Sequence, residues 1–135
     1  MTSRKSLTAR GIPVERSFYS NQEPFITHGK IELENSGDSP TILAIEQVRC
    51  LAGNDVTSIE DFFLYLLPDY VEGDPDQIEL PANTTNQYEV SFPRLSAVPY
   101  LSEEIQIEVT FETDRGERFQ ARSPYHISRR TLKRR

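Results

Sequence analysis

The chain has 135 residues, of which 36% are hydrophobic and 10% aromatic, enough for one domain around a single core. Its one cysteine, Cys50, excludes an internal disulfide. The first ten residues are polar and basic, and the longest apolar run, 62–67, is too short to cross a bilayer. We therefore expect neither a signal peptide nor a transmembrane segment, and either a cytoplasmic protein or part of an assembled particle.

The charges are segregated along the sequence, and this matters more than the formal net charge of −6. Residues 17–114 carry 19 acidic and 3 basic side chains, which gives this body of the chain a net charge of −16. Residues 1–16 and 115–135 have net charges of +3 and +7. The sequence thus predicts an acidic body with basic ends, as in a salt-adapted or acid-surfaced protein.

Short runs of β-branched and aromatic residues, separated by turn residues, predict an all-β protein. The first predicted strand spans Ile12 to Tyr19, at a sheet edge because Pro13 has no N–H to donate. The next spans Phe25 to Leu33 and breaks at the turn-forming residues 35–38. Its alternation predicts that one face carries Phe25, Thr27, Gly29, Ile31 and Leu33.

A further strand is predicted over Thr41 to Leu51, where the apolar positions change phase between Ile45 and Val48. Such a change indicates burial on both faces or a β-bulge. Shorter strands are predicted at Ile78 to Leu80 and at Gln87 to Phe92.

The segment 58–67 is compatible with two structures. Its apolar residues follow helical spacing, and Ser58 with Asp61 resembles a capping box. The aromatic residues of 62–67 favour a buried strand instead. Pro68 ends the element in either case, so both a strand and a short helix remain open.

The last predicted element is a hairpin that starts with the alternating run Glu104 to Glu112. A three-residue loop, 114–116, provides a glycine for the left-handed position that this hairpin class needs. Only a register in which Phe111 faces Phe119 puts both apolar sets on one side. This register places Glu112 opposite Arg118 and Glu108 opposite Arg122, which we interpret as ion pairs on a sheet surface.

Seven or eight strands at this spacing predict an immunoglobulin-like Greek-key β-sandwich over residues 1–128, followed by a basic C-terminal tail, 129–135. The run from Gly29 to Asp38, the strand from Ile42, the segment 78–81 and the final hairpin resemble prokaryotic immunoglobulin-like modules of the cell-adhesion-related type. The resemblance implies a spacer, adhesion or assembly module without chemistry of its own. The chain lacks the Trp and the cysteine pair of antibody domains.

Catalytic motifs are absent from the sequence, so we expect no enzyme and no catalytic residues. His28 and His126 are the two imidazoles, both predicted at outward strand positions, and Cys50 lies in an apolar strand. No phosphate-binding loop, paired-cysteine metal motif or cofactor motif is present. One acidic loop offers carboxylates of the kind that bind Ca²⁺, although without EF-hand spacing: Asp69, Glu72, Asp74 and Asp76.

The basic tail provides the candidate partner-binding residues Arg129, Arg130, Lys133, Arg134 and Arg135. A polyanion would be repelled by the acidic body, so nucleic acid is disfavoured. The tail is either solvated or bound to an acidic protein surface, including the body of a second copy. The leading hypothesis is a structural or assembly module. The alternatives are a small regulatory adaptor that binds at a sheet edge, and a ligand-binding or enzymatic sandwich with an unrecognised site.

Overall fold

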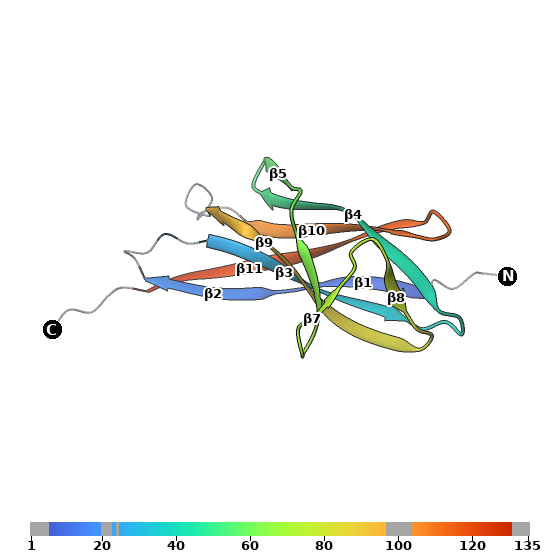
Figure 1. Ribbon diagram of the computed structural model, residues 1–135. Coiled ribbons are helices and arrows are strands. Elements are labelled where there is room, and N and C mark those ends of the chain that lie inside the picture. The colour runs from blue at the N-terminus through green and yellow to red at the C-terminus, as the bar shows by residue number, and fades with distance from the viewer. Residues whose placement is uncertain (1–5, 20–22, 24, 97–103, 131–135) are drawn as a thin grey trace.

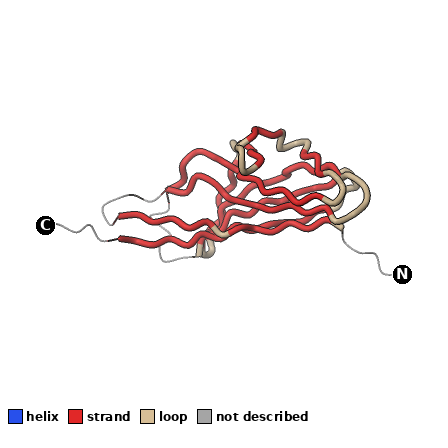
Figure 2. The backbone as a smooth tube through the Cα atoms, turned by 90° about the horizontal axis from the view of Figure 1, so that it is seen from below, coloured by secondary structure: helices blue, strands red, loops and turns tan. Residues whose placement is uncertain are grey.

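The computed structural model describes residues 6–19, 23, 25–96 and 104–130, and over these residues the chain is all β (Figures 1 and 2). Eleven strands form two sheets packed face to face. The first has the order β1-β3-β9-β6-β7 and the second the order β2-β11-β10-β4-β5, with β8 as its sixth strand, paired to β4. The strands are β1 (Leu7–Ile12), β2 (Val14–Tyr19), β3 (Phe25–Asn35), β4 (Thr41–Ala52), β5 (Asp55–Ile59), β6 (Phe63–Leu66), β7 (Val71–Gly73), β8 (Ile78–Leu80), β9 (Thr84–Ser96), β10 (Ile105–Thr113) and β11 (Arg118–Arg130).

The predicted all-β immunoglobulin-like sandwich is confirmed, with more strands than the seven or eight expected. The extra strands come from two places. The N-terminal segment is divided between the sheets, and the stretch 55–80 contributes four short strands along the edges. Within the described residues, no helix is long and apolar enough to span a membrane.

The core lies between the sheets and is built from the inward positions of the alternating strands. Its fully enclosed side chains include Ile31, Leu33, Val90, Ile107 and Phe111. Cys50 is buried among these residues as a free thiol, as expected for a cysteine in an apolar strand.

The N-terminal segment crosses from one sheet to the other at Pro13. β1 pairs antiparallel with β3, whereas β2 pairs parallel with β11, so both strands are sheet edges. One strand was predicted from Ile12 to Tyr19, but the structure has two here. β1 begins before Ile12, and Pro13 separates β1 from β2 because it interrupts the pairing. At the crossing the backbone of Gly11 contacts that of β11, and a Cβ there would lie 1.6 Å from the Arg122 carbonyl oxygen.

The final hairpin has the predicted register. Phe111 faces Phe119, with ring centroids 5.3 Å apart, and Glu108 faces Arg122. Gly116 in the loop has a φ of 83°, the left-handed conformation that the loop requires.

Two β-bulges change which side chains are buried. The predicted change of phase in β4 is a bulge opposite Thr110 and Phe111 of β10. In β3 the register shifts between Ile26 and His28, so Ile26 is buried together with Gly29. The prediction that Phe25 and Thr27 share the buried face is therefore wrong, because the alternation does not continue through the bulge.

The segment 58–67 is strand rather than helix. It contains the end of β5 and all of β6, separated by a bend at 60–62. Ile59 in β5 and Leu64 in β6 are buried, whereas Phe63, directly before Leu64, is exposed. The apolar residues therefore satisfy a period of two within each strand, and the helical spacing arises from the bend between them.

Candidate functional site

Basic residues gather on the strands at one edge of the sandwich. β1, β2 and β11 together contain six arginines and one carboxylate, Glu15. β10 pairs with β11 only as far as Tyr125, so residues 126–130 of β11 pair, among the described residues, with β2 alone. We call β2 and residues 126–130 the basic end.

Two of the five predicted partner-binding residues, Arg129 and Arg130, therefore lie in β11, with Phe18 and Tyr19 as their backbone partners. The predicted tail starts two residues too early, because pairing with β2 extends β11 to Arg130. The other three, Lys133, Arg134 and Arg135, lie outside the described residues. In the basic end the Arg16 guanidinium stacks over Phe18, 5.3 Å from the ring centroid.

The opposite edge is acidic. Residues 50–93 contain nine carboxylates and no Lys, Arg or His. β5 and β7, the terminal strands of the two sheets on this side, both lie within this stretch. We call the segment Asp55 to Glu79 the acidic side. It carries eight of the nine carboxylates and crosses the front of the molecule in Figure 1.

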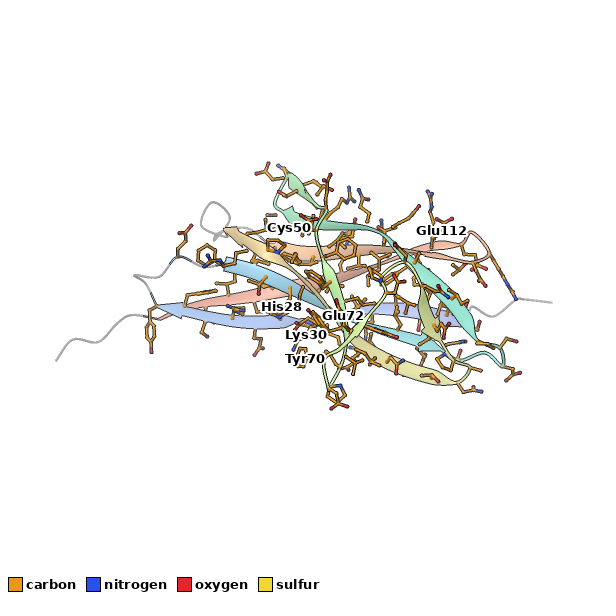
Figure 3. The ribbon with its side chains drawn as sticks, viewed as in Figure 1. His28, Lys30, Cys50, Tyr70, Glu72 and Glu112 are labelled. Atoms are coloured by element: carbon orange, nitrogen blue, oxygen red, sulfur yellow. The ribbon has the colours of Figure 1, made fainter. Side chains whose placement is uncertain are left out.

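The acidic side also carries most of the exposed apolar surface. The six large hydrophobic side chains exposed among the described residues include four from this segment, each more than half exposed: Val56, Phe63, Tyr70 and Val71. The Tyr70 ring lies 6.5 Å from the ring of Tyr65. In Figure 3, Tyr70 and Glu72 lie on the same stretch of chain. Apolar side chains framed by carboxylates are typical of a protein-binding surface.

The four calcium-ligand candidates are not gathered into one site. Asp69 lies in the turn after β6, Glu72 in β7, and Asp74 with Asp76 in the following turn. All four are exposed, and the Asp74 carboxylate accepts a hydrogen bond from the backbone N–H of Asp76 at 2.9 Å. In the part of the chain that the structure describes, no three His, Cys, Asp or Glu side chains are placed to hold a metal ion.

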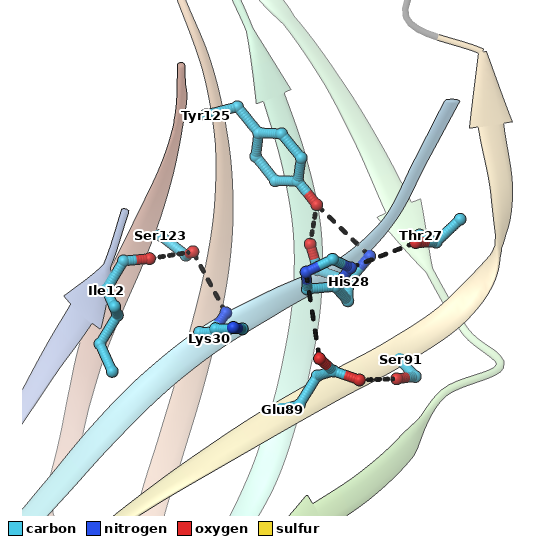
Figure 4. A network of polar contacts seen from close by, with 8 residues as sticks. All are labelled: Ile12, Thr27, His28, Lys30, Glu89, Ser91, Ser123 and Tyr125. Atoms are coloured by element: carbon cyan, nitrogen blue, oxygen red, sulfur yellow. Dashed lines mark hydrogen bonds and ion pairs between the residues drawn. The ribbon is translucent and has the colours of Figure 1, made fainter. Parts of the chain in front are cut away.

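A polar network surrounds His28 at the register shift between β3 and β9 (Figure 4). Its Nδ1 lies 3.2 Å from the Thr27 hydroxyl, and its Nε2 lies 3.9 Å from a Glu89 carboxylate oxygen. The Ser91 hydroxyl donates to the other Glu89 oxygen at 2.9 Å. Burial lowers the pKa of His28, and the positive charges of Arg16 and Lys30 act in the same direction, while Glu89 opposes them.

This network also ties the two sheets together, because the Tyr125 hydroxyl on β11 donates to the His28 backbone carbonyl on β3. Burial raises the pKa of Tyr125 far above its ordinary value. These contacts could not be predicted from the sequence, since they depend on the register shift between β3 and β9. The network places a hydroxyl, an imidazole and a carboxylate together. Two cavities lined by described residues lie elsewhere, and neither histidine lines them.

The larger of these cavities has a volume of about 640 Å³ and lies at the end of the sandwich that holds the turn after β3 and the β10–β11 loop. Charged side chains there are Asp38, Arg115, Glu117 and Arg118.

Burial raises the pKa of the Cys50 thiol, which keeps it protonated and weakly nucleophilic.

No family model matches the sequence, and no curated protein matches it. Among solved structures, the chain is similar to a family 123 glycoside hydrolase from Clostridium perfringens, with 10% identity and a TM-score of 0.50. The match covers 93% of this chain but 28% of the hydrolase chain, so it concerns only a part of that protein. This likeness shows the fold alone. The chain is an immunoglobulin-like β-sandwich.

Smaller β-sandwich proteins are also similar in structure. PapD-like domain 7 of human CEP192 has 14% identity and a TM-score of 0.45, with 98% of this chain and 92% of that domain covered. The CooA pilin subunit from enterotoxigenic Escherichia coli has 7% identity and a TM-score of 0.41, with 93% of this chain and 99% of the pilin covered.

Proposed function

We propose that the chain is a non-enzymatic structural module that assembles with other copies of itself through protein–protein contacts. The observation that carries this proposal is the charge segregation within one sandwich, with six arginines on β1, β2 and β11 and eight carboxylates on the acidic side. A basic end and an acidic side on the same molecule are complementary between copies. The resemblance to prokaryotic cell-adhesion-related modules supports a role of this kind.

Sedimentation of the full chain across protein concentrations, at about 20 mM and 500 mM NaCl, tests the proposal. We expect an average mass that rises with concentration at low salt and falls toward the monomer at high salt, because exposed charges are screened over about 10 Å at 0.1 M. A variant with Arg129→Glu and Arg130→Glu is expected to remain monomeric. A monomer at every concentration and both salts would overturn the proposal.

A second candidate function is an adaptor that binds another protein by strand addition. The free edge of β5 favours it, since residues 55–58 are exposed and, among the described residues, the strand pairs only with β4. This function predicts a monomer whose binding to its partner depends weakly on salt, because backbone hydrogen bonds would hold the added strand. The sedimentation series therefore separates the two candidates.

A further inference from the structure

We infer that the ridge formed by β6, β7 and the turn between them receives the basic end of a second copy. This inference rests on the proposed self-assembly and assigns its receiving surface. The ridge is defined by four aromatic or apolar side chains and two carboxylates: Phe63, Tyr65, Tyr70, Val71, Asp69 and Glu72.

The side chains that define the ridge lie outside the core, whereas Leu64 of β6 is buried in it. β7 has three residues, all exposed, and ends its sheet in the described part of the chain. Phe63 and Tyr70 are each 55% exposed, and Val71 is 57% exposed. Exposed aromatic residues of this size are frequent anchors of protein interfaces, where burial removes their apolar area from water.

The chemistry of the ridge selects a cationic partner rich in arginine. Each of the charged residues in the segment Asp55 to Glu79 is negative. A guanidinium stacks on a tyrosine or phenylalanine ring and pairs with a carboxylate in two parallel hydrogen bonds, whereas a lysine offers only a point charge. Arginine provides 12 of the 15 basic residues of this chain. The basic end therefore has the composition that the ridge requires.

The sheet geometry favours contact between copies over contact within one copy. β7 is separated from β1, at the opposite edge of its own sheet, by four strand spacings, or about 19 Å. The basic end belongs to the other sheet on the β1 side. The ridge and the basic end of one copy therefore lie at opposite edges of the sandwich, where a second copy can present its basic end to the ridge.

The contact joins two different surfaces, so each copy can bind one neighbour through its ridge and another through its basic end. Such a heterologous contact builds rings or open filaments rather than closed two-fold dimers. A mixture of two defective variants tests this directly, because each variant keeps the surface that the other lacks.

The ridge variant carries Phe63→Ser and Tyr70→Asn. Both side chains are exposed, and asparagine suits the positive φ of 55° at position 70. The basic-end variant carries Arg129→Glu and Arg130→Glu. The matched control carries Val56→Thr and Ile42→Thr, which remove exposed apolar surface away from the ridge. Thermal unfolding of every variant checks that the sandwich is intact.

We expect the ridge variant and the basic-end variant each to associate at least tenfold more weakly than the unmodified chain at low salt, and the control to associate normally. An equimolar mixture of the two defective variants is expected to give a 1:1 dimer and nothing larger.

Three outcomes would overturn the inference. If the folded ridge variant assembles as well as the unmodified chain, the ridge is not the receiving surface, while the proposed assembly function stands. If the mixture gives no dimer, the ridge and the basic end do not meet. If the unmodified chain is monomeric throughout, both the inference and the proposed assembly function fail.

Discussion

The hydroxyl of Ser123 on β11 donates a hydrogen bond to the backbone carbonyl oxygen of Ile12 at 2.7 Å, across the point where the N-terminal segment changes sheets. The Ser123 hydroxyl oxygen in turn accepts a hydrogen bond from the backbone N–H of Lys30 on β3 at 3.2 Å. Ser123 is fully buried. One small hydroxyl thus satisfies backbone groups of two other strands and holds the crossing segment against both sheets (Figure 4).

Replacing Ser123 with alanine is therefore expected to lower the free energy of unfolding by about 1–3 kcal/mol, since buried backbone groups lose their partner. Chemical denaturation measures this change. Ser128→Ala, at an exposed position of the same strand, is the control and should change stability by less than about 0.5 kcal/mol. Equal effects at the two positions would show that the bridge contributes nothing.

Gly11→Ala is expected to be more damaging, because the new Cβ would lie 1.6 Å from the Arg122 carbonyl oxygen and 2.1 Å from its carbon. Backbone atoms cannot move aside as a flexible side chain can, so we expect a loss of about 3 kcal/mol or more. Gly73→Ala is the matched control, since its Cβ would meet Leu64 at an ordinary 3.5 Å. A folded Gly11→Ala protein with unchanged thermal unfolding would contradict the close approach.

Glu108 is fully buried although it lies on the outer face of its sheet, because arginines from both neighbouring strands cover it. It accepts hydrogen bonds from Arg49 Nε at 2.9 Å and from Arg122 Nε at 3.0 Å. Glu108→Leu leaves two guanidinium groups unpaired and is expected to lower the free energy of unfolding by about 2 kcal/mol.

Replacing all three residues of this ladder, Arg49→Met, Glu108→Leu and Arg122→Met, should restore most of that loss, because no buried charge remains. Urea denaturation of the single and triple variants measures the difference. A triple variant less stable than Glu108→Leu would contradict this interpretation of the ladder.

The hairpin and its Glu108–Arg122 ion pair were predictable from the sequence because they depend on local rules. The other predicted pair is wrong: Arg118 lies opposite Glu112 but forms its ion pair with Glu46 at 2.8 Å. Alternation fixes which residues face the core, and the loop with Gly116 fixes the register. That register places Glu108 opposite Arg122. The second arginine of the ladder, Arg49, could not be predicted, since its place opposite Glu108 depends on the bulge in β4.

The basic end and the acidic side were visible as charge patterns, but their positions at opposite edges depend on topology. β1 and β2 join different sheets, and four short strands lie between β4 and β9. The exposure of Phe63 and Tyr70 could not be predicted from the sequence either. Phe63 belongs to the apolar run 62–67, where an aromatic residue is ordinarily assigned to the core, and Tyr70 lies in the acidic loop; both side chains are exposed.

Calcium binding at the acidic side has a simple test. Asp69, Glu72, Asp74 and Asp76 are exposed and distributed over two turns and a strand, so binding would require the loop to rearrange around the ion. We expect less than about 1 °C of change in the thermal midpoint at 1 mM CaCl₂, with MgCl₂ as the ionic-strength control. A calcium-specific rise, abolished by Asp74→Asn with Asp76→Asn, would establish a site.

The lowered pKa of His28 makes stability depend on pH in a defined direction. Burial disfavours the imidazolium, so the folded state binds fewer protons at His28 than the unfolded state does, whose histidine has a pKa of about 6.5. The neutral imidazole therefore contributes stability that is complete above about pH 6.5 and is lost as the pH falls through the folded pKa.

Thermal unfolding of the unmodified chain and of His28→Gln between pH 7.5 and 5 isolates this contribution, because acid effects on the many carboxylates are common to both proteins. We expect the unmodified chain to lose more stability than His28→Gln on acidification. His126→Gln, at an exposed position of β11, should behave like the unmodified chain. If the unmodified chain instead gains stability relative to His28→Gln at low pH, the protonated imidazole is paired with Glu89 strongly enough to outweigh its burial.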